Sequence, residues 1–276
     1  MMDLCLICAL WSGSQNWLQV FKMSKFDLTF TKPWMNAAGS LGFRIGSNSL
    51  IDPSDLGAFV TNPVSLKSRQ PAHQVHFIEF PGGFLMHTGH PNPGLHWLLR
   101  KVTPTWEHMP CPIIVHLLCQ TPAEVTYMVE RLEGIAGIIG FELGLPPHAD
   151  SNLAREFIRA AVHELPVIIR IALDQVISLA DALALERESL DISAISLGPP
   201  RGCLPIGENT LVQGRIYGPA LYPQSLACVQ NLVRSGWKVI GAGGVYSVEQ
   251  AQVMLNAGAM AVQFDAVLWR NNPFSH

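Results

Sequence analysis

Residues 238–268 read KVIGAGGVYSVEQAQVMLNAGAMAVQFDAVL, and this stretch decides the fold. It begins with a short apolar run, 238–242, which is typical of a strand that is buried on both faces. Gly243 and Gly244 follow at once, and because they lack side chains their backbone N–H groups can approach a ligand closely. The first half of the stretch therefore predicts a buried strand that ends in a ligand-binding turn.

The second half of the stretch predicts a helix and another buried strand. Ser247 stands at an N-cap position with Gln250 three residues later, which is a capping box. Gly258 suits the end of the helix, and the next apolar run covers 260–264. Such a pair of units at the end of a (β/α)8 barrel often holds a phosphate. Asp265, however, occupies the place where a second phosphate-holding turn is expected.

The same alternation of strand and helix extends back to Met23, and no repeat or linker divides it. Eight strands with helices between them predict an α/β fold, a closed parallel (β/α)8 barrel or TIM barrel, as a single domain over 23–276. The strands are expected at 34–38, 58–61, 113–117, 138–143, 167–172, 192–197, 238–242 and 260–264, and the helices at 48–56, 93–108, 122–133, 151–164, 175–187, 223–235 and 248–256.

Two features depart from a regular barrel. Only twelve residues follow Phe264, so the eighth helix is expected to be missing or truncated. Its place is then a gap, or is filled by a partner, or reflects a shortened gene. The loops 62–93 and 198–223 are long and rich in Gly and Pro, and loops after strands carry function in this architecture.

Composition narrows the class of protein. Of the 276 residues, 49% are hydrophobic and only 14% are charged. This balance favours an oligomer such as a homodimer, or a partner that covers part of the surface, or simply a barrel with a large core. The net charge is −3 with no basic run, which argues against nucleic-acid binding.

The first 22 residues differ from the rest and are interpreted as an extension that adds nothing to the fold. Their apolar run, 4–11, is too short to span a bilayer and lacks the positive flank of a signal peptide. An amphipathic membrane anchor is the alternative. Cys5 and Cys8 form a CxxC without a second pair to complete a zinc site. We therefore expect a cytoplasmic protein without metal or disulfides and without membrane contact.

Five motifs follow one another along the chain: NAAGSLGF at 36–43, GAFVTNPVSLKSR at 57–69, PGGFLMHTGHPNPGL at 81–95, GRIYGPALYP at 214–223 and GAGGV at 241–245. Individually they are weak, but in this order they are specific, and they resemble the dihydroorotate dehydrogenase family of FMN-containing barrels. The resemblance covers about residues 26–268. It implies oxidation of dihydroorotate to orotate with hydride transfer to FMN.

The resemblance implies roles for residues that match the family pattern. Ala38 and Gly39 would lie along the flavin with their backbone. Gly218, Gly243 and Gly244 would contact its phosphate. Tight turns of any barrel are the alternative explanation of these glycines. The substrate loop is matched by Gly89, Pro91 and Asn92, and Asn92 is expected to hydrogen-bond the substrate.

Two cationic positions of the family are changed. After the second strand the family has Lys near the flavin, and this chain has Asn62. On the fifth strand a Lys near the flavin ring becomes Arg170, which keeps the charge but is larger and planar. An Arg within an apolar strand needs a ligand or a partner, and a carboxylate such as Glu142 is the alternative partner.

The fourth strand departs most from the family pattern. It reads FELGLPPHAD at 141–150, with Gly144 in place of a substrate-binding Asn and no thiol or hydroxyl to serve as the base. His148 is the nearest titratable group and is predicted as the general base. A solvated loop histidine is the alternative.

Asp265 and Ala266 replace the Gly-Thr pair whose N–H groups hold the flavin phosphate in the family. A carboxylate about 4 Å from a phosphate would cost about 4 kcal/mol at an effective dielectric of 20, roughly a thousandfold in affinity. Pairing of Asp265 with Arg270 or Arg215 would relieve this cost.

These observations leave three hypotheses. The first is an FMN-dependent oxidoreductase that acts on dihydroorotate or an altered small-molecule substrate and passes electrons to an external acceptor or reductase. The second is a degenerate relative that acts as a binding or structural subunit. The third is a barrel enzyme without flavin. Against a Schiff-base enzyme, no Lys lies at the carboxyl end of a candidate strand. Against a metal enzyme, the candidate ligands fit no standard spacing. Those candidates are His87, His90, His96 and His116.

Overall fold

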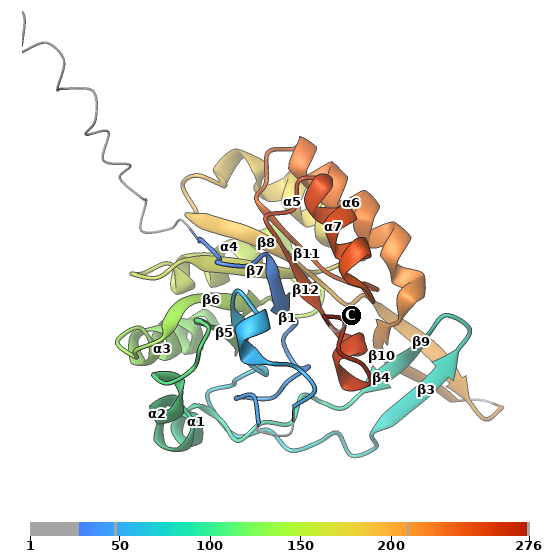
Figure 1. The fold of residues 1–276 in the computed structure, drawn as a ribbon, viewed down its shortest axis with the longest axis horizontal. Coiled ribbons are helices and arrows are strands. Elements are labelled where there is room, and N and C mark those ends of the chain that lie inside the picture. The colour runs from blue at the N-terminus through green and yellow to red at the C-terminus, as the bar shows by residue number, and fades with distance from the viewer. Residues whose placement is uncertain (1–27, 47–48, 209, 275–276) are drawn as a thin grey trace, which may run out of the picture.

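Eight parallel strands close into a barrel in the computed structural model, which describes residues 28–46, 49–208 and 210–274 (Figure 1). The predicted fold class is confirmed. The extension at 1–22 lies outside these ranges. The barrel strands, in the order in which they pair, are β1 (Trp34–Asn36), β12 (Ala261–Phe264), β11 (Val239–Gly241), β8 (Ile192–Gly198), β7 (Val167–Ala172), β6 (Ile138–Gly144), β5 (Ile113–Leu118) and β2 (Phe59–Val60).

The seam between β1 and β2 closes the barrel with few backbone bonds. One bridge joins Met35 to Ala58. The buried side chain of Asn36 also joins the two strands. Its amide donates to the Val60 carbonyl at 2.7 Å, and its oxygen accepts from the Val60 N–H at 2.9 Å. A side-chain amide here mimics the backbone ladder that such short strands lack.

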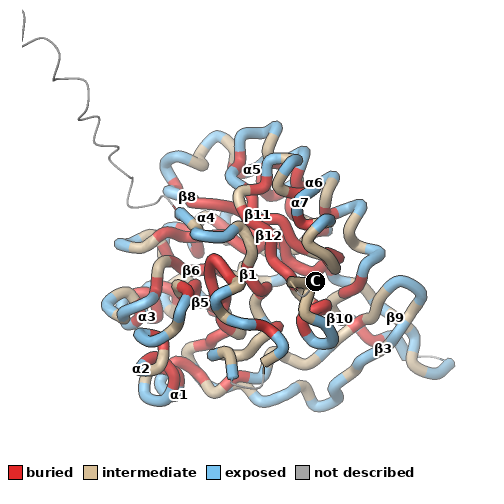
Figure 2. Tube along the Cα trace, viewed as in Figure 1, coloured by how far each residue is buried: buried red, intermediate tan, exposed pale blue. Residues whose placement is uncertain are grey.

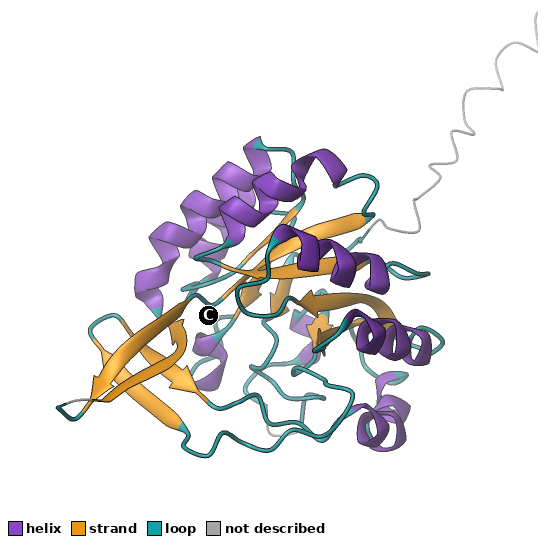
Figure 3. Ribbon diagram, turned by 180° about the vertical axis from the view of Figure 1, so that it is seen from behind, coloured by secondary structure: helices purple, strands orange, loops and turns teal. Residues whose placement is uncertain are grey.

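Helices form the outer layer (Figure 3). Their starts follow local capping rules: Thr121, Asp150 and Ser247 each accept a backbone N–H at an N-cap. The helices are α1 (Leu95–Lys101), α2 (Thr103–Trp106), α3 (Pro122–Leu132), α4 (Ser151–Ala161), α5 (Val176–Leu183), α6 (Tyr222–Arg234) and α7 (Val248–Asn256), with 3-10 turns η1 (Pro53–Asp55), η2 (Ala184–Glu186), η3 (Pro219–Leu221) and η4 (Ala266–Trp269). The helix expected at 48–56 is thus wrong in its described part, where only η1 forms.

The core has two parts, which appear as the red segments of Figure 2. The larger part lies between the strands and the helices. The smaller part fills the barrel and includes Met35, Val60, Ile114 and Ile168. The barrel strands therefore have apolar residues on both faces, as their largely hydrophobic sequences predict.

The two long loops are not irregular, which corrects the sequence interpretation. They form a four-stranded antiparallel sheet in the order β3-β4-β10-β9 beside the barrel. Its strands are β3 (His76–Phe80), β4 (Gly83–His87), β9 (Arg201–Ile206) and β10 (Thr210–Tyr217). Figures 1 and 3 show this sheet projecting from the end of the barrel that holds η4.

The expectation of a missing eighth helix is confirmed in the described residues, where η4 stands in its place. Ala266, Val267 and Leu268 of η4 are buried. Phe274 packs edge-on against Phe264, with ring centroids 5.1 Å apart. The short C-terminal segment therefore covers part of the gap itself. No helix within the described ranges has the length and apolarity needed to cross a membrane.

Candidate active site

Five polar side chains form a buried layer above the apolar floor of the barrel. Side chains alternate across a strand, so the residue two positions after an inward apolar residue also faces inward. Each polar residue lies toward the carboxyl end of its strand, where barrel active sites are built. The five are His116 on β5, Glu142 on β6, Arg170 on β7, Ser196 on β8 and Gln263 on β12.

Glu142 is the centre of this layer and is fully buried. Its two oxygens lie 2.6 Å from His116 Nδ1, 2.7 Å from Ser196 Oγ, 2.7 Å from Gln263 Nε2 and 3.2 Å from an Arg170 nitrogen. Burial alone would raise the pKa of Glu142, but the Arg170 charge and the His116 hydrogen bond lower it well below its usual range. The carboxylate is therefore ionised.

His116 is held in one tautomer by this carboxylate. Burial lowers the pKa of His116, against the opposing effect of Glu142, so the ring is neutral. An ionised carboxylate only accepts hydrogen bonds, so Nδ1 carries the proton and Nε2 keeps its lone pair. Nε2 packs against Gly144, where an added Cβ would lie 2.9 Å away. Gly144 therefore makes room for the His116 ring.

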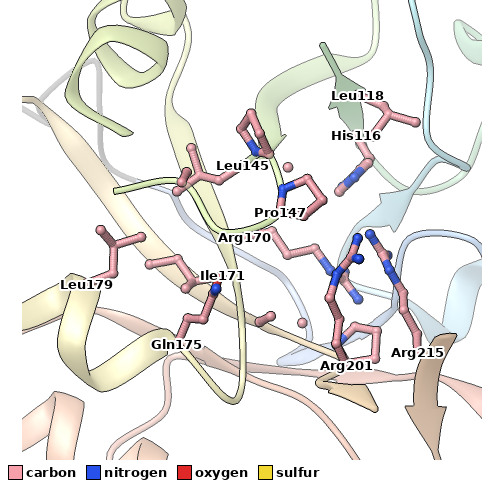
Figure 4. Close-up of a pocket in the computed structure, with 16 residues that line it drawn as sticks. His116, Leu118, Leu145, Pro147, Arg170, Ile171, Gln175, Leu179, Arg201 and Arg215 are labelled. Atoms are coloured by element: carbon pink, nitrogen blue, oxygen red, sulfur yellow. The ribbon is translucent and has the colours of Figure 1, made fainter. Parts of the chain in front are cut away.

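A hollow, the inner hollow, opens above this layer. Its polar walls are His116, Arg170, Arg201, Arg215 and Gln175, and prolines and aliphatic residues line the rest. In Figure 4 the ends of the Arg170, Arg201 and Arg215 side chains converge near His116. Arg170 thus pairs with Glu142, the alternative considered from sequence, and also faces the hollow.

The predicted phosphate residues come together in a small hollow of their own. It is lined by Gly218, Gly243, Gly244, Asp265 and Ala266, together with Pro199 and Tyr246. Gly243 and Gly244 have φ of 95° and 73°, in the region that favours glycine. An added Cβ at Gly244 would lie 2.5 Å from the Tyr222 nitrogen, so the packing of the chain itself also requires this glycine.

Asp265 does not form the ion pairs that would remove it from the phosphate turn. Within the described ranges its carboxylate has no ion pair within 4 Å, and Arg270 pairs with Glu79 instead at 3.6 Å. The pairing with Arg270 or Arg215 that would relieve the cost at a phosphate is therefore not formed among the described residues. Burial raises the pKa of Asp265 to about 6, although the more distant charges of Arg170 and Arg215 oppose the shift.

The first-strand loop holds the residues expected along a flavin. Gly39 is exposed with φ of 95°, and an added Cβ there would meet no atom within 4 Å, while Ala38 is half-buried. Asn62 pins this loop, because its side chain accepts from the Gly42 N–H at 3.1 Å. Trp269 of η4 donates to the Ser40 carbonyl at 3.1 Å. Open space thus lies beside Gly39, whereas the Asn62 oxygen already has a partner.

The loop expected to frame the substrate is ordered by Asn92. Its Oδ1 accepts from the Ser65 N–H, the Ser65 hydroxyl and the Gly94 N–H, and its amide donates to the His90 carbonyl. Asn92 is buried and its hydrogen bonds are directed into the protein. These contacts support a structural role; its predicted contact with substrate stays a prediction, as does that of Gly89, which has φ of 76° in the same loop.

His148 lies on the exposed loop after β6 with φ of 58°. Its Nδ1 is 3.4 Å from Gln175 Nε2. The neighbours Pro147 and Ala149 line the inner hollow, but His148 is not among its lining residues. Its role as base stays a prediction. Within the described ranges no three His, Cys, Asp or Glu residues are grouped so that they could hold a metal ion.

Comparison with known proteins places this chain in a family. The dihydroorotate dehydrogenase family model matches residues 20–276. The chain belongs to the dihydroorotate dehydrogenase family. It is 29% identical over 254 residues to the dihydroorotate dehydrogenase B (NAD(+)) catalytic subunit of Geobacter sp. strain M21, covering 84% of this chain and 81% of that protein. The subunits of the same name from Trichlorobacter lovleyi (29% over 260 residues; 86% and 84% covered) and Citrifermentans bemidjiense (28% over 254 residues; 84% and 81%) are similar.

The dihydroorotate dehydrogenase family is one of oxidoreductases that bind FMN, and the residues present fit its phosphate on one condition. The Ser225 hydroxyl lies beside Gly243, is buried and has no hydrogen-bond partner among the described residues, although it does not line the small hollow itself. The condition concerns Asp265. Protonating a carboxyl of pKa about 6 at pH 7 costs about 1.4 kcal/mol, a tenfold loss of affinity, instead of the thousandfold loss from charge repulsion.

Sequence reasoning located Arg170 but missed the layer to which it belongs. Ser196 and Gln263 were not singled out, His116 was considered only as a metal ligand, and Glu142 only as a partner of Arg170. A signal was present, because each of these strands carries one polar residue at an inward position within an apolar run.

Proposed function

We propose that this protein is an FMN-dependent oxidoreductase of the dihydroorotate dehydrogenase type, acting on dihydroorotate or a related small carboxylate in pyrimidine synthesis. The observation that carries the proposal is the His116–Glu142 pair at 2.6 Å, with His116 facing the inner hollow at the carboxyl end of the barrel. A neutral imidazole oriented by a carboxylate is a common general base.

The proposed chemistry divides among this chain's own residues. Oxidation of dihydroorotate removes a proton from one carbon and a hydride from its neighbour, and the chemistry that bound FMN supplies is acceptance of that hydride. His116 Nε2 takes the proton, and Glu142 stabilises the resulting imidazolium. Arg170 supplies a positive charge beside the ring system, and Arg215 attracts the substrate carboxylate.

The cofactor would be held by the residues predicted from sequence. The phosphate would lie at Gly218, Gly243, Gly244 and Ala266, with protonated Asp265 donating a hydrogen bond. The flavin would run beside Ala38 and Gly39, with Asn62 holding the loop that carries them.

Partner and location complete the proposal. The relatives are catalytic subunits, which supports a partner subunit that accepts electrons from this chain. The four cysteines within the described ranges are free, which supports a reducing, cytoplasmic location.

The test begins with the visible spectrum of the purified full chain, with and without added FMN. We expect a bound flavin that dihydroorotate bleaches under anaerobic conditions. His116→Asn should slow bleaching by roughly 10²–10⁴ while flavin stays bound, and His148→Ala is the matched control that should leave the rate unchanged. The flavin content of each variant shows whether it has folded.

The outcomes separate the hypotheses. A colourless protein that takes up no FMN would overturn the proposal. Bound flavin with a slow His148→Ala variant and a normal His116→Asn variant would assign the base to His148, as the sequence predicts.

The second candidate function is a binding or structural subunit without catalysis. It is favoured by the 144–149 segment, which contains neither thiol nor hydroxyl, and by the unpaired carboxylate of Asp265 at the phosphate turn. The failure of FMN uptake just described is the result that this candidate predicts.

A further inference from the structure

A second hollow adjoins the inner hollow and shares two of its walls. This outer hollow lies over β4 and β10 and is lined by Arg69, His90, Gln213 and residues of both strands. Arg201 and Arg215 line both hollows. Among the described residues, neither lining contains an Asp or Glu. The two hollows, together the joined hollows, therefore meet at Arg201 and Arg215.

The arginines of this surface repel one another in the fold itself. Arg201 of β9 is the direct register partner of Arg215 of β10 in the antiparallel pair. Like charges opposite each other on neighbouring strands are destabilising. Within the described ranges neither side chain makes an ion pair within 4 Å, and the group that most supports the charge of Arg215 is the Tyr217 phenol.

Two neighbouring groups respond to the accumulated positive charge. Burial lowers the pKa of Arg215, and the charges of Arg170 and Arg201 lower it further. Burial also lowers the pKa of His90 to about 2, with Arg215 and Arg69 among the charges that add to the shift. Four arginines thus face the joined hollows, and in the described part of the chain only Arg170 has a carboxylate partner.

We propose that the joined hollows bind a small molecule with two anionic groups. One group lies among Arg170, Arg201 and Arg215 in the inner hollow, and the other lies at Arg69 in the outer hollow. The shared chemistry is two oxyanions on one small molecule, either carboxylates or phosphates. The inference rests on the proposed function in naming the substrate class of the same site, and it implies a substrate with one more anionic group than dihydroorotate.

Binding of simple anions to the flavin-free full chain tests this inference without turnover. The probes are inorganic phosphate, pyrophosphate and succinate, measured by isothermal titration calorimetry at pH 7.5. We expect pyrophosphate or succinate to bind at least tenfold more tightly than inorganic phosphate, because one ligand then satisfies both hollows. Whichever of the two binds more tightly identifies the phosphate or the carboxylate source.

Variants locate the site. Arg201→Gln and Arg215→Gln should each weaken binding of the two-group anion by roughly tenfold or more. Both should melt at the wild-type temperature or above it, because each removes a like-charge pair. Arg234→Gln is the matched control, since Arg234 is exposed in the last turn of α6, and it should bind as wild type.

Equal affinity for phosphate and the two-group anions, or equal loss in all three variants, would overturn the inference. Failure of the proposed function is seen separately. A colourless protein that still binds pyrophosphate would overturn the proposed function but keep the anion site. A protein that binds flavin but none of the three probes would keep the proposed function and overturn the anion site.

Discussion

At the scale of single residues, one buried carboxylate determines the chemistry of its neighbours. Glu142 fixes the His116 tautomer and anchors Arg170, Ser196 and Gln263. A buried carboxylate without partners would cost several kcal/mol of stability, so the loss of any one of these partners destabilises the whole group. The hydrogen bond that orients His116 therefore also contributes to stability at this point of the barrel.

Asp265, in contrast, destabilises the folded protein when its carboxyl is ionised. Its pKa in the folded protein, about 6, lies above the value of 3.8 expected for the unfolded chain, so the folded state binds the proton more tightly. Stability therefore falls as pH rises through this window, and the full penalty is present above pH 6. Asp265→Asn should raise the free energy of unfolding by about 1–2 kcal/mol at pH 8, measured by urea denaturation. This range is set below the free energy of the full pKa shift because Asp265 is only half-buried.

The same substitution should change the pH dependence of FMN binding. Wild-type affinity is expected to fall as pH rises above 6, because binding takes up a proton on Asp265, whereas Asp265→Asn should show a flatter profile in a fluorescence titration. Asp181→Asn, an exposed site on α5, is the control for both measurements. A stability gain that persists unchanged at pH 5 would contradict this account.

The sequence could locate Arg170, Gly243 and Gly244 because each is conspicuous locally, as a charge in an apolar strand or as a turn. It could not show that Glu142 meets Gln263, which is 121 residues away. Strand order and stagger set that contact, and neither is encoded near either residue. Nor could it show whether Asp265 would pair with Arg270, since β3 brings Glu79 to Arg270 instead.

At the scale of elements, the long loops fold because each has a partner in the other. His76–Phe80 and Gly83–His87 form a hairpin around Pro81 and Gly82, but β4 also pairs with β10, more than 120 residues later. An isolated two-stranded hairpin is marginal in water, whereas four strands together are stable. Composition rich in Gly and Pro concealed this sheet, because the sequence shows its turns and not the distant pairing.

Trp269 fastens this sheet to the barrel. Its ring lies 5.8 Å from both Phe84 and Tyr217, and its Nε1 donates to the Ser40 carbonyl. Trp269→Ala should lower the free energy of unfolding by about 1–3 kcal/mol, less than a fully buried Trp because the side chain is partly exposed. Hydrogen exchange should also quicken for the amides of β4 and β10.

Trp97→Ala provides the control for this element. Trp97 has similar exposure, lies on α1 and packs against Phe43, away from the small sheet. Its loss should leave exchange in β4 and β10 unchanged. Equal protection of these strands in both variants would show that Trp269 does not hold the sheet.

At the scale of the whole molecule, net charge and local charge have opposite signs. The chain carries a formal charge of −3, yet the joined hollows are lined by arginines without a carboxylate among their lining residues. A cleft of one sign focuses the field on ligands of the other sign, whatever the total charge. Composition alone therefore argues against nucleic acid as a partner but cannot reveal the arginines that gather at the joined hollows.

This distribution predicts that anion binding depends on ionic strength in spite of the negative net charge. Raising NaCl from about 0.01 to about 0.15 M shortens the Debye length from about 30 to about 8 Å, which screens Arg69 and exposed Arg201 from an approaching anion. The pyrophosphate affinity of the wild-type chain should therefore fall severalfold across this range. Arg201→Gln should show a shallower salt dependence, and Arg234→Gln should follow the wild type. An affinity that is independent of salt in the wild type would mean that the arginines do not act through their joint field.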